Sequence, residues 1–243
     1  MARGIRSRTC EHGRDEEDLS RELAAVTMRL AFLDARDARV ESTWRTLEAA
    51  ARPTYFLTWG WIEAWLVALP REAMPQLVVI TDGGVTVAAC FLGRRRMFRR
   101  NVIPVRARFL NTTGIAHLDE LCVEHNRVLC LPGTGLSLAA LIELLPRDWD
   151  ELVLPAVDAG TFDPLAVGGE HQIHVAHEVS APFVDLSRAR AAGDYLSLLS
   201  ANTRTQLRRA RRSVGPCELE SARSAAHAFE IYDELVALHT ASW

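Results

Sequence analysis

The apolar positions of the chain change their period several times, and each period predicts an element of secondary structure. Alternating apolar and polar residues are typical of a half-buried strand, whereas apolar positions three and four apart are typical of a helix. Helices end at Pro53 and Pro70, and residues 82–84 (DGG) form a tight turn between two strands. The predicted strands are residues 27–34, 77–81, 85–92, 102–110, 127–131, 151–154, 172–179 and 183–185. The predicted helices of this part are residues 41–51, 58–69 and 136–145, with Thr58 as a cap.

The pattern becomes helical after Pro182. Residues 193–214 carry an apolar stripe at helical spacing, which predicts one long amphipathic helix that Gly215 and Pro216 end. Residues 217–220 fit a short strand, and a second helix follows at residues 222–240. The predicted domains are a flexible tail at residues 1–20, a first domain at residues 21–190 and the opening of a second domain at residues 191–243.

The order of strand, helix and aromatic-rich segment occurs twice along the chain. The two copies are residues 27–34, 41–51 and 55–65, and then residues 217–220, 222–240 and Trp243. The first copy continues into a hairpin and a sheet, whereas the second stops. One interpretation is an internal repeat cut short, so that the chain holds part of a longer protein. The other is an ordinary C-terminal helix, and the pattern alone leaves both open.

The composition excludes several classes of protein. The chain has 243 residues, 49% of them hydrophobic and 24% charged, which excludes a disordered, collagen-like or disulfide-scaffold protein. The net charge of -3 argues against nucleic-acid binding through overall charge but leaves a local basic face open. All 28 basic residues are arginine, which excludes a lysine Schiff base or a lysine general base within the chain.

Membrane spans and disulfides are not predicted. The longest apolar run, residues 128–145, is broken by Pro132, Gly133 and Gly135 and fits a strand, a turn and a buried helix. Acidic residues follow the N-terminus where a secretory signal needs an apolar stretch. The five cysteines are odd in number and widely spaced, so we expect reduced, mostly buried thiols in a cytoplasmic protein.

The strongest candidate for chemistry is an arginine-rich segment of the predicted helix, residues 200–213. Its arginines are Arg204, Arg208, Arg209, Arg211 and Arg212, and no acidic residue occurs between Asp194 and Glu218. Guanidinium groups this close repel one another unless an anion or an acidic side chain neutralises them. The segment fits a face for a phosphate-bearing ligand, such as a coenzyme, a nucleotide-sugar or a tRNA. It equally fits a solvated face paired with acids elsewhere in the fold.

A second arginine-rich stretch lies on the hairpin and the strand after it. Its members are Arg94, Arg95, Arg96, Arg99, Arg100, Arg106 and Arg108, with no acid between Asp82 and Asp119. Arg106 and Arg108 alternate with apolar residues, which predicts one solvated face of a strand. The stretch either forms one basic cleft with the arginine helix or is a separate basic surface.

Two further motifs carry weaker signals. Residues 132–135 (PGTG) join a strand to a helix, where backbone amides can hold a pyrophosphate, but a plain turn fits better because neither common nucleotide-binding glycine motif is present. His171, His174 and His177 have a metal-like spacing. In a strand, however, His174 faces away from the other two, so no metal site is expected.

The arginine helix and the chain end resemble a known family. Residues 200–212 (SxNxRxxLRRxxR), followed by residues 238–243 (LHxxxW), resemble the junction into the acetyltransferase domain of the CelD/BcsL, or cellulose-biosynthesis-type, group. That group belongs to the GNAT superfamily and is similar to the Fem-type aminoacyl transferases. Earlier motifs agree with the resemblance: Phe56 with Trp61, residues 108–111 (RFLN) and residues 149–154 (WDxLxL).

The resemblance implies an α/β (α+β) fold with a GNAT-like mixed central sheet flanked by helices, followed by the truncated start of a second GNAT-like domain. It implies an acetyl-CoA or other acyl-CoA co-substrate and a small-molecule or saccharide acceptor. By the same resemblance, the residues expected to bind the substrate or the coenzyme are Arg204, Arg208, Arg209, Arg212, His239 and Trp243. Because the central strands of the second domain would follow Trp243, we expect this chain to be inactive alone, with a partner chain covering its C-terminal edge.

Two functions from different classes follow. The first is an acyl-CoA-dependent N- or O-acyltransferase acting on a sugar or cell-envelope precursor, of which this chain lacks most of the catalytic domain. The second is a non-catalytic binding module that recognises an anionic polymer or a tRNA through its arginine-rich faces. Binding that tracks phosphates weakens steeply with salt, so salt dependence distinguishes the two.

Overall fold

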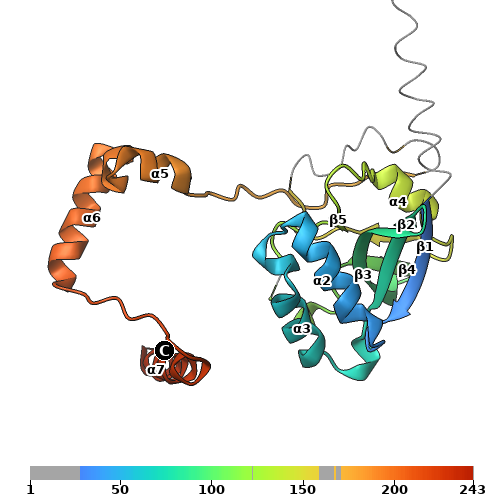
Figure 1. The fold of residues 1–243 in the computed structure, drawn as a ribbon, viewed down its shortest axis with the longest axis horizontal. Helices are drawn as coiled ribbons and strands as arrows, with labels where there is room; N and C mark the ends of the chain where they lie inside the picture. Colours follow the sequence, from blue (N-terminus) through green and yellow to red (C-terminus); the bar gives the residue numbers. More distant parts are fainter. Residues whose placement is uncertain (1–27, 122, 159–166, 168–170, 243) are drawn as a thin grey trace, which may run out of the picture. The chain divides into compact units, whose positions relative to one another are not determined.

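The structure is a computed structural model that describes residues 28–121, 123–158, 167 and 171–242. Its backbone contacts divide the chain between His174 and Val175 into two units (Figure 1), each described by itself below. The predicted tail, residues 1–20, lies outside the described residues. The first unit contains β1 (Met28–Asp34), α2 (Arg39–Ala51), η1 (Tyr55–Leu57), α3 (Trp59–Ala68), η2 (Arg71–Ala73), β2 (Gln76–Asp82), β3 (Val85–Arg99), β4 (Ile103–Leu110), η3 (Ala116–Leu118), β5 (Leu129–Cys130), α4 (Leu138–Leu144) and β6 (Glu151–Val153).

The first unit is built on a six-stranded mixed sheet. The strand order is β1-β2-β3-β4-β6, and β5 pairs with β3 outside this path. All pairs are antiparallel except β4 with β6, which is parallel. Helices flank the sheet (Figure 1), so the predicted α/β class with a mixed central sheet is confirmed.

Each face of the sheet has its own core because side chains alternate along a strand. Leu77 and Val79 of β2 face α2 and α3, whereas Val78 and Ile80 face the side covered by α4. On the α2 side the centre is Trp44, which is fully buried, donates a 2.9 Å hydrogen bond to the Leu57 carbonyl and lies 5.2 Å from the Phe91 ring. The indole therefore ties α2 to both η1 and the middle of the sheet.

The start of α3 differs from the expected cap. Thr58 occupies the cap position, but its hydroxyl donates to the Tyr55 carbonyl instead of accepting from the helix. The Trp59 amide donates instead to Glu48 of α2 at 2.8 Å. The two helices are thus joined by a carboxylate at the positive end of a helix, where a negative charge is favourable.

Two buried asparagines hold β3, β4 and the segment after β6 together. β3 is long because Leu92 and the residues after it pair with β4, whereas its earlier residues pair with β2 and β5. Between β4 and β5 the chain leaves the sheet, so Phe91 of β3 lacks a neighbouring strand on that side. Asn111 takes its place: its amide donates to the Phe91 carbonyl at 2.8 Å, and its Oδ1 accepts from the Phe91 amide at 2.8 Å.

Asn126 completes the junction from the other side. Its Oδ1 accepts from Asn111 Nδ2 at 2.8 Å, and its own Nδ2 donates to the carbonyls of Leu110 and Pro155, both at 2.9 Å. Both asparagines are fully buried. Asn126 therefore bridges the parallel strands β4 and β6 at the point where they end.

Two of the sequence motifs have a structural explanation in this sheet. Residues 108–111 and 149–154, predicted as separate motifs, lie on neighbouring parallel strands, with Arg108 opposite Leu152. Phe56 and Trp61 pack edge to face with ring centroids 4.9 Å apart. These motifs of the first unit serve packing and strand pairing.

The second unit contains α5 (Leu186–Ala192), η5 (Tyr195–Leu198), α6 (Ala201–Val214) and α7 (Ala225–Ser242). The single helix predicted at residues 193–214 is wrong, because Gly193 ends α5 in a left-handed conformation and the side chain of Asp194 caps the next turn. No side chain described from Val175 to Ser242 is buried.

Three predicted strands are not formed. Residues 172–179, 183–185 and 217–220 are irregular in the part of the chain that the structure describes. Without the strand at 217–220, the second copy of the possible internal repeat lacks its first element. Its last element, Trp243, lies outside the described residues. These segments have no neighbouring strand to satisfy their backbone groups, so local β-propensity does not decide their conformation.

Replacing Asn111 with alanine is expected to destabilise the first unit by about 3 kcal/mol or more, because buried groups of Phe91, Asn126 and Arg127 lose partners. Urea unfolding monitored by tryptophan fluorescence measures the loss. Asn101→Ala is the matched control: Asn101 shares a positive φ with Asn111 but is exposed, so its replacement is expected to cost about 1 kcal/mol. Equal losses in the two variants would contradict the role of the network.

Candidate anion-binding site

A capping serine and a glycine fix the two ends of helix α6. The Ser200 hydroxyl accepts from the Thr203 amide at 3.2 Å, which is the usual serine cap. Gly215, with a φ of 83°, ends the helix, and Pro216 cannot continue it. The described helix therefore spans 14 residues, Ala201–Val214.

The arginines of α6 gather on one side of the helix. At about 100° per residue, Arg204, Arg208, Arg211 and Arg212 fall within an arc of about 100°. Arg209 lies about 60° beyond the edge of this arc. Leu207, Ala210 and Val214 form an apolar stripe next to the arc, which leaves the arginines on an uninterrupted face, called here the arginine face.

Within the second unit, no acidic side chain of the described residues neutralises this face. The ion pairs of the structure do not include any arginine of α6. Arg208, Arg209, Arg211 and Arg212 are all exposed, and Arg204 is half-buried. Like charges at i and i+4, as in Arg204 with Arg208, destabilise a helix by a few tenths of a kcal/mol. A bound polyanion would remove this repulsion.

Four arginines of the second arginine-rich stretch are neutralised, in contrast to those of α6. Arg94 and Arg108 pair with Asp148 at 3.4 and 2.8 Å, Arg106 pairs with Asp150 at 2.8 Å, and Arg99 pairs with Glu151 at 2.6 Å. The acids come from the start of β6, which lies beside β4. These four arginines are thus partners of a structural acidic segment, while Arg95, Arg96 and Arg100 have no ion pair among the described residues.

Arg108 corrects the expected solvated face of β4. Its side chain is 5% exposed, its Nη2 donates to both oxygens of Asp148 at 2.8 Å, and its guanidinium lies 5.7 Å from the Phe32 ring centroid. Phe32 of β1 and Asp148, which precedes β6, lie against this side chain, so an arginine that alternates as if solvated is buried.

The ion pairs lower the pKa values of the acids. The hydrogen bond from the Arg106 side chain, followed by that from its backbone amide, holds the pKa of Asp150 at about 2. Hydrogen bonding to Arg108 and to Arg99 places the pKa values of Asp148 and Glu151 below their usual ranges. All three carboxylates therefore remain charged well into the acidic range.

His239 lies exposed in the last turn of α7, on a different helix from the arginines. Trp243, the remaining predicted site residue, lies outside the described residues. The structure therefore brings Arg204, Arg208 and Arg212 together on one face, and sets Arg209 beside it.

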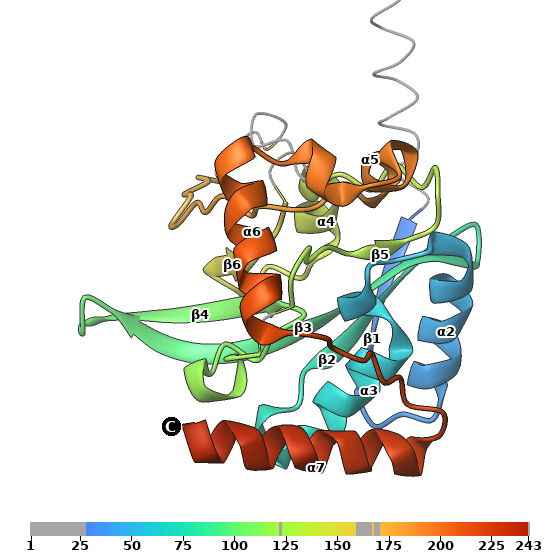
Figure 2. The same cartoon turned by 90° about the vertical axis from the view of Figure 1, so that its left-hand side faces the viewer.

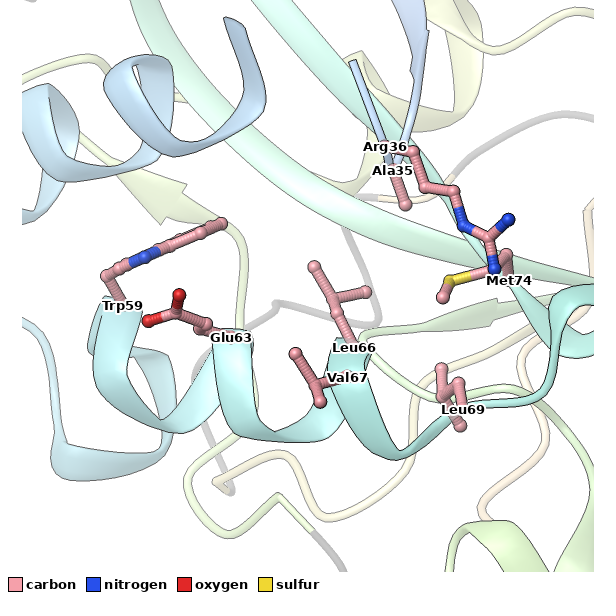
Figure 3. A pocket seen from close by; sticks show the side chains of 8 residues that line it. All are labelled: Ala35, Arg36, Trp59, Glu63, Leu66, Val67, Leu69 and Met74. Atoms are coloured by element: carbon pink, nitrogen blue, oxygen red, sulfur yellow. The ribbon is translucent and has the colours of Figure 1, made fainter. Parts of the chain in front are cut away.

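The cavities of the first unit include two that contain acidic side chains in their walls. The larger, of about 400 Å³, lies between α3 and the turn after β1 (Figure 3). Its walls are mainly apolar and include Leu66, Leu69 and Met74. Glu63 lies beside Trp59 at one end, and Arg36 lies beside Met74 at the other (Figure 3). The smaller, of about 260 Å³, lies where β4 and β6 end and includes Phe109, Val153 and Asp119.

The carboxylate of Asp119, at the smaller cavity, accepts hydrogen bonds from the loop that surrounds it. Asp119 accepts hydrogen bonds from the amides of Thr113 and Gly114 and from the Thr113 hydroxyl, at 2.7–2.9 Å. A side chain at Gly114 would lie 2.4 Å from the Phe109 ring, so the loop packs on this ring only with glycine. Asp119 thus shapes the loop.

The weaker sequence motifs do not form ligand sites in the described residues. Thr134 closes a tight turn by donating from its hydroxyl to the Leu131 carbonyl at 2.8 Å, and Ser137 caps α4. His171, His174 and His177 lie in an irregular segment and not in a strand. No group of three or more His, Cys, Asp or Glu side chains that could hold a metal ion occurs in the described part. In the same part, no helix has the length and apolar character needed to cross a bilayer.

Comparisons with known proteins complete the description. No family model matches the chain, and no curated protein matches it. Among solved structures, the chain is similar to ribosomal-protein-alanine N-acetyltransferase from Brucella melitensis biovar Abortus 2308, with a TM-score of 0.32 and 18% sequence identity. The alignment covers 65% of this chain and 98% of that protein. Membership of the CelD/BcsL group stays a prediction from the sequence motifs.

Lowering the pH is expected to remove the stability that the acids before and on β6 contribute. A carboxyl whose pKa is lowered on folding stabilises the protein above its unfolded pKa and loses that effect as pH falls through the folded pKa. Since Asp150 has a folded pKa of about 2 against 3.8 without a partner, its contribution is complete at about pH 5 and declines towards pH 2.

Urea midpoints measured between pH 2 and pH 7 test this expectation. Asp150→Asn is expected to lower the midpoint near neutral pH and to approach the parent protein at the acidic end. Glu72→Gln, at an exposed site, serves as the control and should change the midpoint little. A pH-independent difference between parent and Asp150→Asn would argue against the electrostatic origin.

The cysteines are expected to differ in reactivity because burial suppresses the thiolate. Burial raises the pKa of Cys130 to about 11 and raises that of the fully buried Cys90 further. Cys217 is exposed. In the native protein, labelling with a maleimide followed by peptide mass mapping should modify Cys217 first and Cys90 only after unfolding. Early labelling of Cys90 would show that the α4 side of the sheet opens readily.

Proposed function

We propose that this chain is part of an acyl-CoA-dependent acyltransferase of the GNAT superfamily, and that the arginine face of α6 binds the phosphates of the coenzyme. The observation that carries the proposal is that, among the described residues of the second unit, the arginines of α6 have no acidic partner. Arg204 and Arg212 are eight residues apart, which corresponds to about 12 Å along the helix. A face of this length suits a ligand with several phosphate groups, as coenzyme A has.

Arginine is suited to this role. Its planar guanidinium binds two phosphate oxygens at once, and hydrogen bonds of this type are roughly twice as strong as neutral ones. Without an acidic partner in the described part of the second unit, the guanidiniums of α6 lose no ion pair of that unit when a ligand binds. The paired arginines of β3 and β4 would have to release Asp148, Asp150 or Glu151 first.

The reaction would be direct transfer. An amine or hydroxyl of the acceptor attacks the thioester carbonyl, a base takes its proton, and the coenzyme leaves as its thiolate. We propose a sugar or cell-envelope precursor as the acceptor, following the family resemblance. The first unit then serves as a non-catalytic domain, because its buried asparagines and its Asp119 are engaged in holding the fold. We expect this chain alone to bind the coenzyme without transferring the acyl group.

The alternative is a binding module for an anionic polymer or a tRNA. The exposed, continuous arginine face fits this function too, since phosphates of any backbone are recognised by the same guanidiniums. The two functions differ in salt dependence. A polymer that contacts several arginines loses affinity steeply as salt rises, whereas a coenzyme that also makes apolar contacts loses less.

Calorimetric titration of the chain with acetyl-CoA at low and high salt tests the proposal. Binding in the micromolar range is expected, and Arg208→Glu with Arg212→Glu should weaken it by about tenfold or more, because two charge-assisted contacts become repulsive. The thermal unfolding midpoint of this variant should stay close to that of the parent protein, since both side chains are exposed.

Arg95→Glu with Arg96→Glu is the matched control. It makes the same change of charge at two exposed arginines without an ion pair among the described residues, on β3. Unchanged acetyl-CoA affinity in this control and a loss in the α6 variant would support the proposal. No acetyl-CoA binding by a parent protein that unfolds cooperatively would overturn it. Salt-sensitive binding of tRNA through the same arginines would then favour the alternative.

A further inference from the structure

The tip of the β3–β4 hairpin projects beyond helices α2, α3 and α4 of the first unit (Figure 2). The turn is tight: Arg100 and Asn101 both have positive φ, of 50° and 61°, and the Val102 amide donates to the Arg99 carbonyl at 3.2 Å. Positive φ at both central residues of the turn 99–102 is typical of type I′, and residues 100–102 connect the paired Arg99 and Ile103. The tip is therefore a regular, hydrogen-bonded turn.

Large apolar side chains are exposed at this tip. Phe98 is 66%, Val102 74% and Ile103 52% exposed. Neighbouring Pro104 is exposed as well. Exposed apolar residues scattered singly are ordinary on a protein surface, but a group of them at one projecting point is typical of an interaction site.

These apolar side chains do not share one face of the hairpin. Phe98 pairs with Pro104 and Arg99 pairs with Ile103, and paired residues lie on the same face of a sheet. Successive residues alternate, so Phe98 and Ile103 lie on opposite faces, with Val102 in the turn between them. The tip is apolar on both faces.

Positive charge surrounds the apolar tip. Arg95, Arg96 and Arg100 are exposed and have no ion pair among the described residues. Arg99, in contrast, is held by Glu151. Three unneutralised guanidiniums therefore lie within a few residues of Phe98, and the next acids along the chain, Asp82 and Asp119, are remote in sequence.

We propose that this hairpin tip docks the protein onto an anionic phospholipid bilayer. Phe98, Val102 and Ile103 would enter the boundary between headgroups and acyl chains, while Arg95, Arg96 and Arg100 contact the lipid phosphates. A bilayer accepts a tip that is apolar on both faces, whereas a groove in a protein would cover one. Nucleic acid fits less well, because the aliphatic side chains of Val102 and Ile103 cannot stack on bases.

Sedimentation of the full chain with vesicles tests the proposal. Vesicles of phosphatidylcholine with phosphatidylglycerol are expected to bind the protein, and vesicles of phosphatidylcholine alone to bind it weakly. Arg95→Gln with Arg96→Gln should lower the partition coefficient roughly 25-fold, since each arginine near an anionic surface contributes about fivefold. Phe98→Ser with Val102→Ser should reduce binding to both kinds of vesicle, because apolar area is lost.

Two controls separate the tip from other surfaces. Val85→Ser removes a 61% exposed apolar side chain at the opposite end of β3 and should leave binding unchanged. Arg208→Glu with Arg212→Glu, on α6, should retain the dependence on Phe98 and Val102. A Phe98→Trp variant gives a direct readout, because its fluorescence should shift to the blue and be quenched by brominated lipid when the tip inserts.

The opposite outcomes would overturn the proposal. These are no binding to anionic vesicles by the parent protein, equal binding by the parent and the Phe98→Ser, Val102→Ser variant, or binding that only the α6 variant removes. Hairpin-dependent binding of a single-stranded RNA without vesicle binding would also overturn it and assign the tip to nucleic acid. Thermal unfolding at the parent midpoint confirms that each variant is folded.

Discussion

Two buried amide side chains hold the described sheet together where its strands are interrupted. Along one edge of β3 the chain provides β4 and then β5, and the described residues between these two strands leave the sheet. Asn111 satisfies both backbone groups of Phe91 at this break, and Asn126 links it to the carbonyls of Leu110 and Pro155. An unpaired buried backbone group costs free energy comparable to that of a lost hydrogen bond. The long β3 strand, the parallel β4–β6 pair and the core on each face depend on this junction.

The junction also explains nearby choices of residue. Asn111 has a φ of 49°, a conformation that asparagine tolerates better than most residues. A side chain at Gly93 would lie 2.3 Å from the Thr112 carbonyl oxygen, so the chain that leaves β4 passes β3 only because this residue is glycine. Backbone proximity, and not ligand binding, fixes these positions.

The arginines of the described residues fall into two groups, those with an acidic partner and those without one. On β3 and β4 the acids of residues 148–151 pair with Arg94, Arg99, Arg106 and Arg108, and these pairs tie the hairpin to β6. The arginine face of α6 and the arginines of the hairpin tip have no such acids among the described residues. A guanidinium without an internal partner is available to an external anion, and the two proposals concern different anions. One is a soluble phosphate ligand at α6, and the other is a lipid surface at the tip.

The sequence by itself determined the elements whose period and punctuation are local. The β2–β3 hairpin and helix α2, with Trp44 and Leu47 buried, both follow from spacing and turn residues. The α/β class with a mixed sheet followed from the family resemblance of the sequence motifs. Local signals at Gly193 and Asp194 also marked the break before α6, although the apolar stripe outweighed them in the prediction.

Partners distant in sequence were decided by the tertiary structure. The sequence pattern places Arg108 on a solvated face, yet Asp148 and Phe32 bury it in the structure. The local pattern could not predict these contacts, because both residues lie forty or more positions away along the chain. The strands predicted at residues 172–179 and 217–220 did not form, since a strand requires a neighbour and local propensity does not supply one. Whether an arginine is paired depends in the same way on which acids the fold brings to it. Periodicity therefore predicts an element, whereas burial and charge pairing at the candidate sites arise only when elements far apart in the sequence meet.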